Sequence, residues 1–281
     1  MLFTGRSIAS LMERLWPPSS RYKPVEASGG AVLEARSIVV EFGGVKAVNG
    51  ASIRVGRHEI VGLIGPNGAG KTTLLNVLSG FYRPKEGRVY YMGRDITGLP
   101  PHARARLGIA RTFQHSELFK HMTVVENIMV NLEPWRPYTV LDAALWLGRA
   151  RRWEVWARER AEEVIELLDL HRYRDRIVGS LPPGIQKRVD LARALVQEPR
   201  IVLMDEPMAG LSREEKEDIA RAIIEVYETS ETSFLLVEHD LEVVMDLCEK
   251  VFVMDYGRVI AEGRPEEVAN DPRVIEAYIG R

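Results

Sequence analysis

Residues 65–73 read Gly65-Pro66-Asn67-Gly68-Ala69-Gly70-Lys71-Thr72-Thr73. They fit the pattern Gly-x-x-x-x-Gly-Lys-Ser/Thr, which is typical of a phosphate-binding loop. The apolar run 60–64 before the loop predicts a buried strand, and the apolar residues 74, 75, 77 and 78 after it share one helical face. The alternative is a glycine-rich turn with a solvated lysine, and the combination of strand, loop, Lys-Thr pair and helix argues against it.

Each residue type in the loop suits a nucleotide phosphate. Glycines at 65, 68 and 70 allow a tight turn that brings backbone N–H groups onto phosphate oxygens. The helix that begins near Lys71 adds the positive end of its dipole. We expect Lys71 to reach the β- and γ-phosphates, and the Thr72 hydroxyl to help hold Mg²⁺. Thr73 is a further candidate phosphate contact.

Length and composition limit the class of protein. The 281 residues suffice for one large domain or a domain with a subdomain. The formal net charge of −2 gives no support for nucleic-acid binding by bulk electrostatics. No uninterrupted apolar run is long enough to span a bilayer, so a membrane connection is expected through a partner or the surface. The single cysteine, Cys248, fits a reducing compartment and is expected to be a buried, inert thiol.

Residues 1–30 are interpreted as a leader and linker. Apolar residues between Ile8 and Trp16 recur at helical spacing, and Pro17-Pro18 ends that pattern. Docking of this helix on its own domain is favoured over a membrane surface or a partner helix. The leader lacks the apolar core and cleavage site of a secretory signal.

Short strands are predicted on both sides of the loop, across 31–64 and near 89–92 and 109–113. Phe42 stands at a strand end. Its ring could stack on a purine or pack in the core as an ordinary aromatic residue, and spacing alone favours the core. Gln114 follows the strand at 109–113, and a glutamine at such a position can orient water or reach a metal.

Helical spacing dominates from about Val124 to Leu170, and a further helix is expected after Gly184. Four tryptophans interleaved with arginines lie in this region, a pattern that can indicate nucleic-acid binding. Acidic residues among them dilute the positive field, so tryptophans packed under a charged face are the preferred interpretation. The four are Trp135, Trp146, Trp153 and Trp156.

Two further strand ends carry polar residues. The apolar run 201–204 ends in Asp205, which suits Mg²⁺ through a coordinated water, and Glu206, which suits orientation or deprotonation of an attacking water. The alternative for this pair is a helix N-cap acid. The run 234–237 ends at His239, for which structural and functional roles are equally expected. A capping box begins a helix at Ser212, a hairpin is predicted around residues 256–257, and helix is predicted for 265–279.

In this order the elements resemble the ATP-binding subunit of ATP-binding-cassette (ABC) transporters, from about Val32 to the C-terminus. Sequences at 42–49 and 271–280 are similar to the branch that serves branched-chain amino acid importers. The resemblance implies an α/β fold: a P-loop NTPase nucleotide-binding domain at 31–281, with an antiparallel β subdomain and an inserted helical subdomain at about 115–180.

The resemblance also implies roles at matching positions. Phe42 would stack on adenine, and Gln114 would sense Mg²⁺ and the attacking water. Asp205 would bind the shell of the metal, Glu206 would be the catalytic base, and His239 would touch the γ-phosphate. All loop residues from Gly65 to Thr73 would contact ATP, namely Gly65, Pro66, Asn67, Gly68, Ala69, Gly70, Lys71, Thr72 and Thr73.

The signature sequence departs from the family. The usual Leu-Ser-Gly-Gly-Gln is replaced by Leu181-Pro182-Pro183-Gly184-Ile185-Gln186. Pro182 has neither a hydroxyl nor an N–H to give a γ-phosphate, whereas Gly184 and the helix start still offer backbone donors. By their position in the signature, both Pro182 and Gly184 are predicted to contact nucleotide.

The implied partners are transmembrane permease subunits, a second cassette in a head-to-tail homodimer or heterodimer, and indirectly a solute-binding protein, with no nucleic acid. The chain would lie on the cytoplasmic face of the cell membrane and use ATP and Mg²⁺ to energise import of a small solute, expected to be a branched-chain amino acid. One alternative is a soluble cassette ATPase acting on nucleic acid or ribosomes, which the single phosphate loop and the lack of heptads disfavour. The other is a regulatory cassette with weak hydrolysis, which the signature favours and Glu206 and His239 disfavour.

Overall fold

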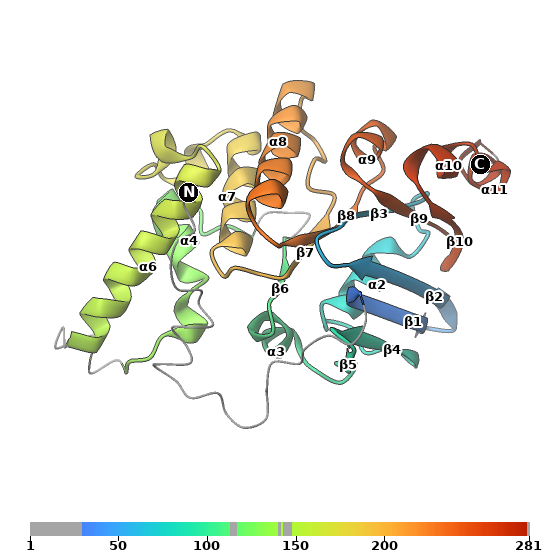
Figure 1. Ribbon diagram of the computed structural model, residues 1–281, viewed down its shortest axis with the longest axis horizontal. Helices are drawn as coiled ribbons and strands as arrows, with labels where there is room; N and C mark the ends of the chain where they lie inside the picture. Colours follow the sequence, from blue (N-terminus) through green and yellow to red (C-terminus); the bar gives the residue numbers. More distant parts are fainter. Residues whose placement is uncertain (1–29, 113–116, 140–141, 143–147, 280–281) are drawn as a thin grey trace. The chain divides into compact units, whose positions relative to one another are not determined.

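The computed structural model describes residues 30–112, 117–139, 142 and 148–279. The chain divides into two compact units (Figure 1). The smaller contains Glu117–Glu198, and the larger combines Val25–Ser116 with Pro199–Arg281. Residues 1–29 of the leader and linker predicted at 1–30, and the candidate Gln114, lie outside the described residues.

A mainly parallel sheet of six strands forms the centre of the larger unit, in the order β10-β9-β3-β8-β7-β6. β3 pairs in parallel with β8 and β9, and β7 pairs in parallel with β6 and β8. Every residue of β3, β7 and β8 is buried, as the continuous apolar runs predict. The strands are Ile60–Ile64 (β3), Ile109–Arg111 (β6), Ile201–Asp205 (β7), Ser233–Val237 (β8), Lys250–Asp255 (β9) and Arg258–Gly263 (β10).

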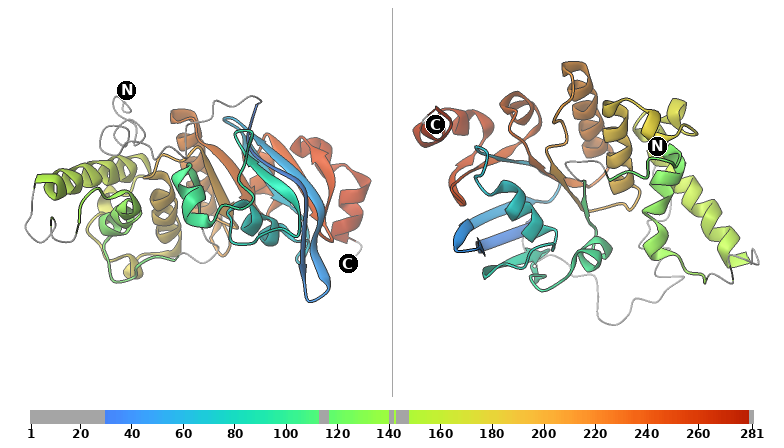
Figure 2. Two further views of the ribbon diagram at one scale, coloured as in Figure 1. Left: turned by 90° about the horizontal axis from the view of Figure 1, so that it is seen from below. Right: turned by 180° about the vertical axis from the view of Figure 1, so that it is seen from behind.

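A second sheet, antiparallel and four-stranded, has the order β2-β1-β4-β5. Its strands are Ala31–Phe42 (β1), Val45–Gly56 (β2), Glu86–Tyr91 (β4) and Arg94–Asp95 (β5). The β1–β2 hairpin, drawn in blue in Figure 2, turns at two glycines with positive φ, Gly43 and Gly44. Helix α2, Lys71–Leu78, contacts strands of both sheets, and its apolar side chains belong to the core that the sheets share.

The other helices of this unit are α3 (Pro101–Arg106), α8 (Arg213–Thr229), α9 (Leu241–Leu247), α10 (Pro265–Ala269) and α11 (Pro272–Ile279). The predicted capping box is confirmed: Ser212 caps α8, and the Glu215 side chain accepts from the Ser212 N–H. The prediction of helix at 265–279 is confirmed for Pro265–Ala269 and Pro272–Ile279, with a break at Asn270 and Asp271 that was not predicted. A physical reason is Pro272, which disfavours helical backbone at the residue before it.

The smaller unit is helical, with α4 (Val124–Val130), α6 (Gly148–Leu167) and α7 (Pro183–Leu195). Single 3-10 turns occur at Glu133–Trp135, His171–Tyr173 and Val178–Ser180. Trp153 is buried, and its ring centroid lies 4.6 Å from that of half-buried Trp156. The expectation of packed tryptophans is thus confirmed for Trp153, while Trp146 lies outside the described residues.

Candidate functional site

Three of the predicted site segments meet at one edge of the six-stranded sheet. The phosphate-binding loop follows β3, Glu206 follows β7 and His239 lies just beyond β8, which pairs between those two strands. The Glu206 N–H donates to the Val237 carbonyl at 2.8 Å, and the Glu238 N–H donates to the Leu63 carbonyl at 3.4 Å. The carboxyl ends of parallel strands are where such sheets bind ligands.

The loop has room only for glycine at two of its turns. A Cβ atom at Gly65, where φ is 148°, would lie 2.1 Å from the Met254 carbonyl oxygen. A Cβ atom at Gly70, where φ is 100°, would lie 2.3 Å from the Ala47 carbonyl oxygen. The glycines therefore let the loop lie directly against neighbouring strands, with α2 beginning at its end.

Lys71 is buried rather than solvated, which contradicts the alternative interpretation of the loop. Its side chain is 6% exposed, and its Nζ donates to the carbonyl oxygens of Gly65 at 2.7 Å and Pro66 at 3.0 Å. Burial lowers the pKa of Lys71, while the nearby charges of Glu206 and Asp205 raise it. The ammonium group thus lies inside the curve of the loop, where it suits a phosphate group.

The Thr72 hydroxyl and the Asp205 carboxylate fit a magnesium ion. The Thr72 Oγ1 donates to Asp205 Oδ1 at 3.3 Å, although the residues are far apart in sequence. Hydroxyl and carboxylate oxygens are ligands that Mg²⁺ accepts, together with water and substrate phosphates. Burial raises the pKa of Asp205, and the Arg111 guanidinium opposes that shift.

Glu206 has unusual backbone geometry. Its φ is 47°, in the left-handed region that side chains other than glycine rarely adopt. Neither Asp205 nor Glu206 caps a helix, because the next helix, α8, begins at Arg213 and is capped by Ser212. The interpretation of this pair as N-cap acids is therefore wrong.

His239 is exposed, whereas its neighbour Glu238 is buried. The Met208 N–H donates to Glu238 Oε1 at 3.0 Å, which ties the end of β8 to the loop after β7. Burial raises the pKa of Glu238. The sequence interpretation gave Glu238 no role, and its only signal was its place beside His239 at a strand end.

Comparison with known proteins decides the family. Residues 48–209 match the family model described as ABC transporter. The chain belongs to the ABC transporter family. The predicted family and fold are confirmed, and the chain is an ATPase subunit of this family.

Residues 258–281 match a second model, described as branched-chain amino acid ATP-binding cassette transporter. The chain is 39% identical over 249 residues to the high-affinity branched-chain amino acid transport ATP-binding proteins LivG of Salmonella typhimurium and BraF of Pseudomonas aeruginosa. Each alignment covers 89% of this chain and 98% of the relative. The crystal structure of a nucleotide-free ATP-binding cassette from an ABC transporter superposes with a TM-score of 0.78 at 36% identity, covering 89% of this chain and all of that one. The cassette is thus of the LivG/BraF-like branch.

The signature of this cassette begins α7. Pro182 is the N-cap residue and Pro183 the first helical residue, so the first N–H of the helix belongs to Gly184. The Gln186 Nε2 donates to the Leu181 carbonyl oxygen at 2.8 Å, and the Gln186 N–H donates to that of Pro182 at 3.0 Å. These bonds fix the turn, and both prolines are exposed.

Phe42 is not a core residue, so the preference for the core is wrong. Its side chain is 49% exposed at the end of β1, where the hairpin turn projects it to solvent. Its ring lies edge-on to that of Tyr82, with 5.3 Å between centroids. An exposed aromatic face leaves Phe42 available to stack on a base.

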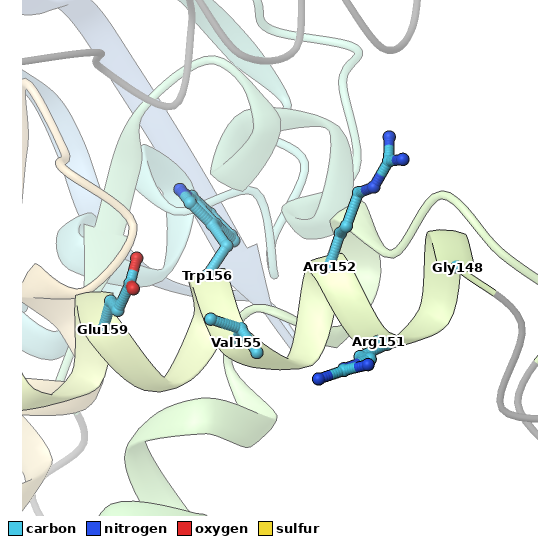
Figure 3. Close-up of a pocket in the computed structure, with 6 residues that line it drawn as sticks. All are labelled: Gly148, Arg151, Arg152, Val155, Trp156 and Glu159. Atoms are coloured by element: carbon cyan, nitrogen blue, oxygen red, sulfur yellow. The ribbon is translucent and has the colours of Figure 1, made fainter.

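The smaller unit has a surface hollow on α6 (Figure 3). The side chains of Arg152 and Trp156 project from the same side of the helix, whereas Arg151 projects from another. All of its lining residues come from α6, and none was predicted as a site residue. They are Gly148, Arg151, Arg152, Val155, Trp156 and Glu159.

Proposed function

We propose that this cassette binds ATP with Mg²⁺ at the edge formed by β3, β8 and β7, and that its hydrolysis energises import of a branched-chain amino acid through permease subunits. The observation that carries the proposal is the Thr72–Asp205 contact beside the buried ammonium of Lys71. A phosphate-binding cation and a pair of oxygen ligands for Mg²⁺ are the parts that phosphoryl transfer requires. The match of residues 258–281 and the names of the relatives support the class of solute.

Each residue has a defined task in this proposal. Lys71 and the loop N–H groups hold the β- and γ-phosphates, and Thr72 and Asp205 hold Mg²⁺, which supplies charge neutralisation when bound. Glu206 orients and deprotonates the attacking water, and exposed His239 contacts the γ-phosphate. Gln114 is proposed to sense the metal and the water, and Phe42 to stack on adenine.

A second cassette completes the site. We assign the helix start at Pro182 and Gly184 to the nucleotide held by a partner cassette, so that ATP favours the closed dimer and hydrolysis opens it. Because Pro182 offers neither O–H nor N–H, this contact depends on backbone groups from Gly184 onward and on the dipole of α7.

Permease subunits, and indirectly a solute-binding protein, are the proposed partners, and nucleic acid is not among them. Among the described residues no helix has the length and apolar character to cross a bilayer. The proposed location is the cytoplasmic face of the membrane, held by the permease.

Reconstitution tests the proposed function. The cassette is placed in proteoliposomes with its permease subunits and solute-binding protein, and ATP-dependent uptake of labelled leucine, isoleucine and valine is measured. Uptake is expected with the unaltered cassette and not with Lys71→Ala, which loses a charge-assisted phosphate contact. Normal uptake with folded Lys71→Ala would contradict the assignment of the site.

A regulatory role with weak hydrolysis is the second candidate, and the Pro182-Pro183 signature favours it. ATP turnover by the same reconstituted complex separates the two. Turnover that rises with solute supports the transport role, whereas tight ATP binding without turnover supports the regulatory one.

A further inference from the structure

Arg111 links the candidate magnesium site to the far end of α2. It is the last residue of β6, and its side chain is 10% exposed. Its Nη1 donates to Asn76 Oδ1 at 2.6 Å and to Ser79 Oγ at 2.7 Å. Its Nη2 donates to Asp205 Oδ2 at 3.2 Å. One guanidinium therefore bridges the last turn of α2 and the acidic end of β7.

The bridge leaves each oxygen of the Asp205 carboxylate with its own donor. Oδ1 accepts from the Thr72 hydroxyl, and Oδ2 accepts from Arg111. Two donors on opposite oxygens fix the plane of a carboxylate, and the rigid fork of a guanidinium restricts it more than an ammonium group does. The carboxylate is almost fully buried, so water does not replace a missing donor.

The same contacts hold α2 at both ends. Thr72 is in the first turn of α2 and contacts Asp205, while Asn76 and Ser79 near its other end contact Arg111. The Arg111 guanidinium also lies 5.3 Å from the centroid of the Phe81 ring, just beyond the helix. The Arg111 side chain thereby helps to fix the position of the Thr72 hydroxyl relative to the Asp205 carboxylate, the two groups proposed to hold Mg²⁺.

We propose that Arg111 is a positioning residue for magnesium: it holds the Asp205 carboxylate in the orientation that receives the ion, without touching the nucleotide. This inference rests on the proposed Mg²⁺–ATP site. Partners that orient a metal-binding carboxylate typically change metal affinity by about 10–100-fold when they are removed. The effect of Arg111 is therefore expected in the magnesium dependence of ATP binding and not in the metal-free affinity for ATP.

The test is binding of a fluorescent, slowly hydrolysed ATP analogue to the full-length chain, with Mg²⁺ varied and with EDTA. Arg111→Gln is expected to raise the Mg²⁺ concentration for half-maximal binding by about tenfold or more. Its affinity in EDTA should stay within about twofold of the unaltered chain. Arg111→Lys keeps the charge but not the fork, so a smaller shift in the same direction is expected.

Arg88→Gln is the matched control, because Arg88 also pairs with an aspartate, Asp95, at 2.6 Å, but is 65% exposed. It should leave both affinities unchanged. An unchanged magnesium requirement in folded Arg111→Gln, or an equal loss of affinity with and without Mg²⁺, would overturn the inference. If Arg111→Gln does not fold, Arg111→Lys decides by the same criteria. Failure of the proposed site itself is distinguishable, since the unaltered chain would then bind the analogue without dependence on Mg²⁺.

Discussion

The hydroxyl of Thr72 donates a hydrogen bond of 3.3 Å to Asp205 Oδ1, across a sequence separation of 133 residues. Thr72 lies in the first turn of α2, and Asp205 is the last residue of β7. The contact joins the phosphate-binding loop to the acidic strand end, so two motifs that are distant in sequence form one site. In the proposed function, this contact would place the Mg²⁺ ligands beside the phosphates of ATP.

Replacing Thr72 should affect the metal before it affects the nucleotide. Thr72→Val removes the hydroxyl at nearly constant volume, whereas Thr72→Ser retains it. We expect Thr72→Val to lower ATP hydrolysis at limiting Mg²⁺ by tenfold or more, which is about 1.4 kcal/mol or more of transition-state stabilisation. Thr72→Ser should stay close to the unaltered cassette. Hydrolysis measured over a range of Mg²⁺ concentrations checks this, and equal losses in both variants would argue against the metal role.

The left-handed backbone of Glu206 predicts that glycine at this position relieves backbone strain, although it removes the carboxylate. Glu206→Gln and Glu206→Gly should both lower hydrolysis by about 100-fold or more, since both remove the proposed base, while ATP affinity is retained. Glycine adopts φ of 47° without strain, so Glu206→Gly should be more stable than Glu206→Gln by about 1 kcal/mol. Urea unfolding of the two variants measures the difference, and a less stable glycine variant would contradict it.

Cys248 predicts a simple probe of unfolding. It is the single cysteine of the chain, is buried, and burial raises the pKa of its thiol to about 12. A thiol reagent at pH 8 should therefore label the chain in urea but not the native cassette. The expectation of a buried thiol is confirmed by its 7% exposure.

The same thiol gives a pH dependence of stability. The folded state keeps the proton up to about pH 12, while an unfolded thiol loses it near pH 8.5. The contribution of this group is fully present below about pH 8.5 and is lost as the pH rises towards about 12. Unfolding free energies measured between pH 8 and pH 10 should fall less in Cys248→Ala than in the unaltered chain. If the unfolding free energy changed equally with pH in both proteins, the raised pKa of the Cys248 thiol would be contradicted.

Arg104 predicts a large loss of stability without direct contact with the site. Its guanidinium donates to five backbone carbonyls, at Val77, Leu78, Ile96, Thr97 and Leu99. Arg104→Lys cannot satisfy all of them, so the free energy of unfolding should fall by about 3 kcal/mol. Arg106→Lys is the control on the same helix, is exposed, and should change stability by less than about 0.5 kcal/mol. If Arg104→Lys lowered the free energy of unfolding no more than Arg106→Lys does, the stabilising role of the Arg104 hydrogen bonds would be refuted.

The sequence predicts most of the fold because its signals are local. The loop at 65–73, the buried runs before Asp205 and His239, and the capping box at Ser212 each depend on neighbouring residues, and each element forms where it is expected. The break before Pro272 also had a local signal in the proline itself.

Buried polar contacts could not be predicted in this way. Arg104 and Arg111 look like ordinary surface arginines in sequence, and only the fold brings carbonyls and Asp205 to them. Phe42 fails for the opposite reason, since a strand-end aromatic resembles a core residue until the hairpin turn exposes it. The candidate site residues of the loop and of the β7 and β8 strand ends were therefore readable as motifs, whereas Phe42 and the arginines at 104 and 111 were not.

The central claim is that this cassette works with membrane permeases, and one pull-down tests it directly. Tagged Glu206→Gln, which should hold ATP without cleaving it, is purified from detergent-solubilised membranes with ATP and Mg²⁺, and the bound proteins are identified. Lys71→Ala, which should not hold ATP, is the matched control for nucleotide-dependent partners. We predict permease subunits and a second cassette with Glu206→Gln. Recovery only from the soluble fraction, together with ribosomes or nucleic acid, would contradict the account.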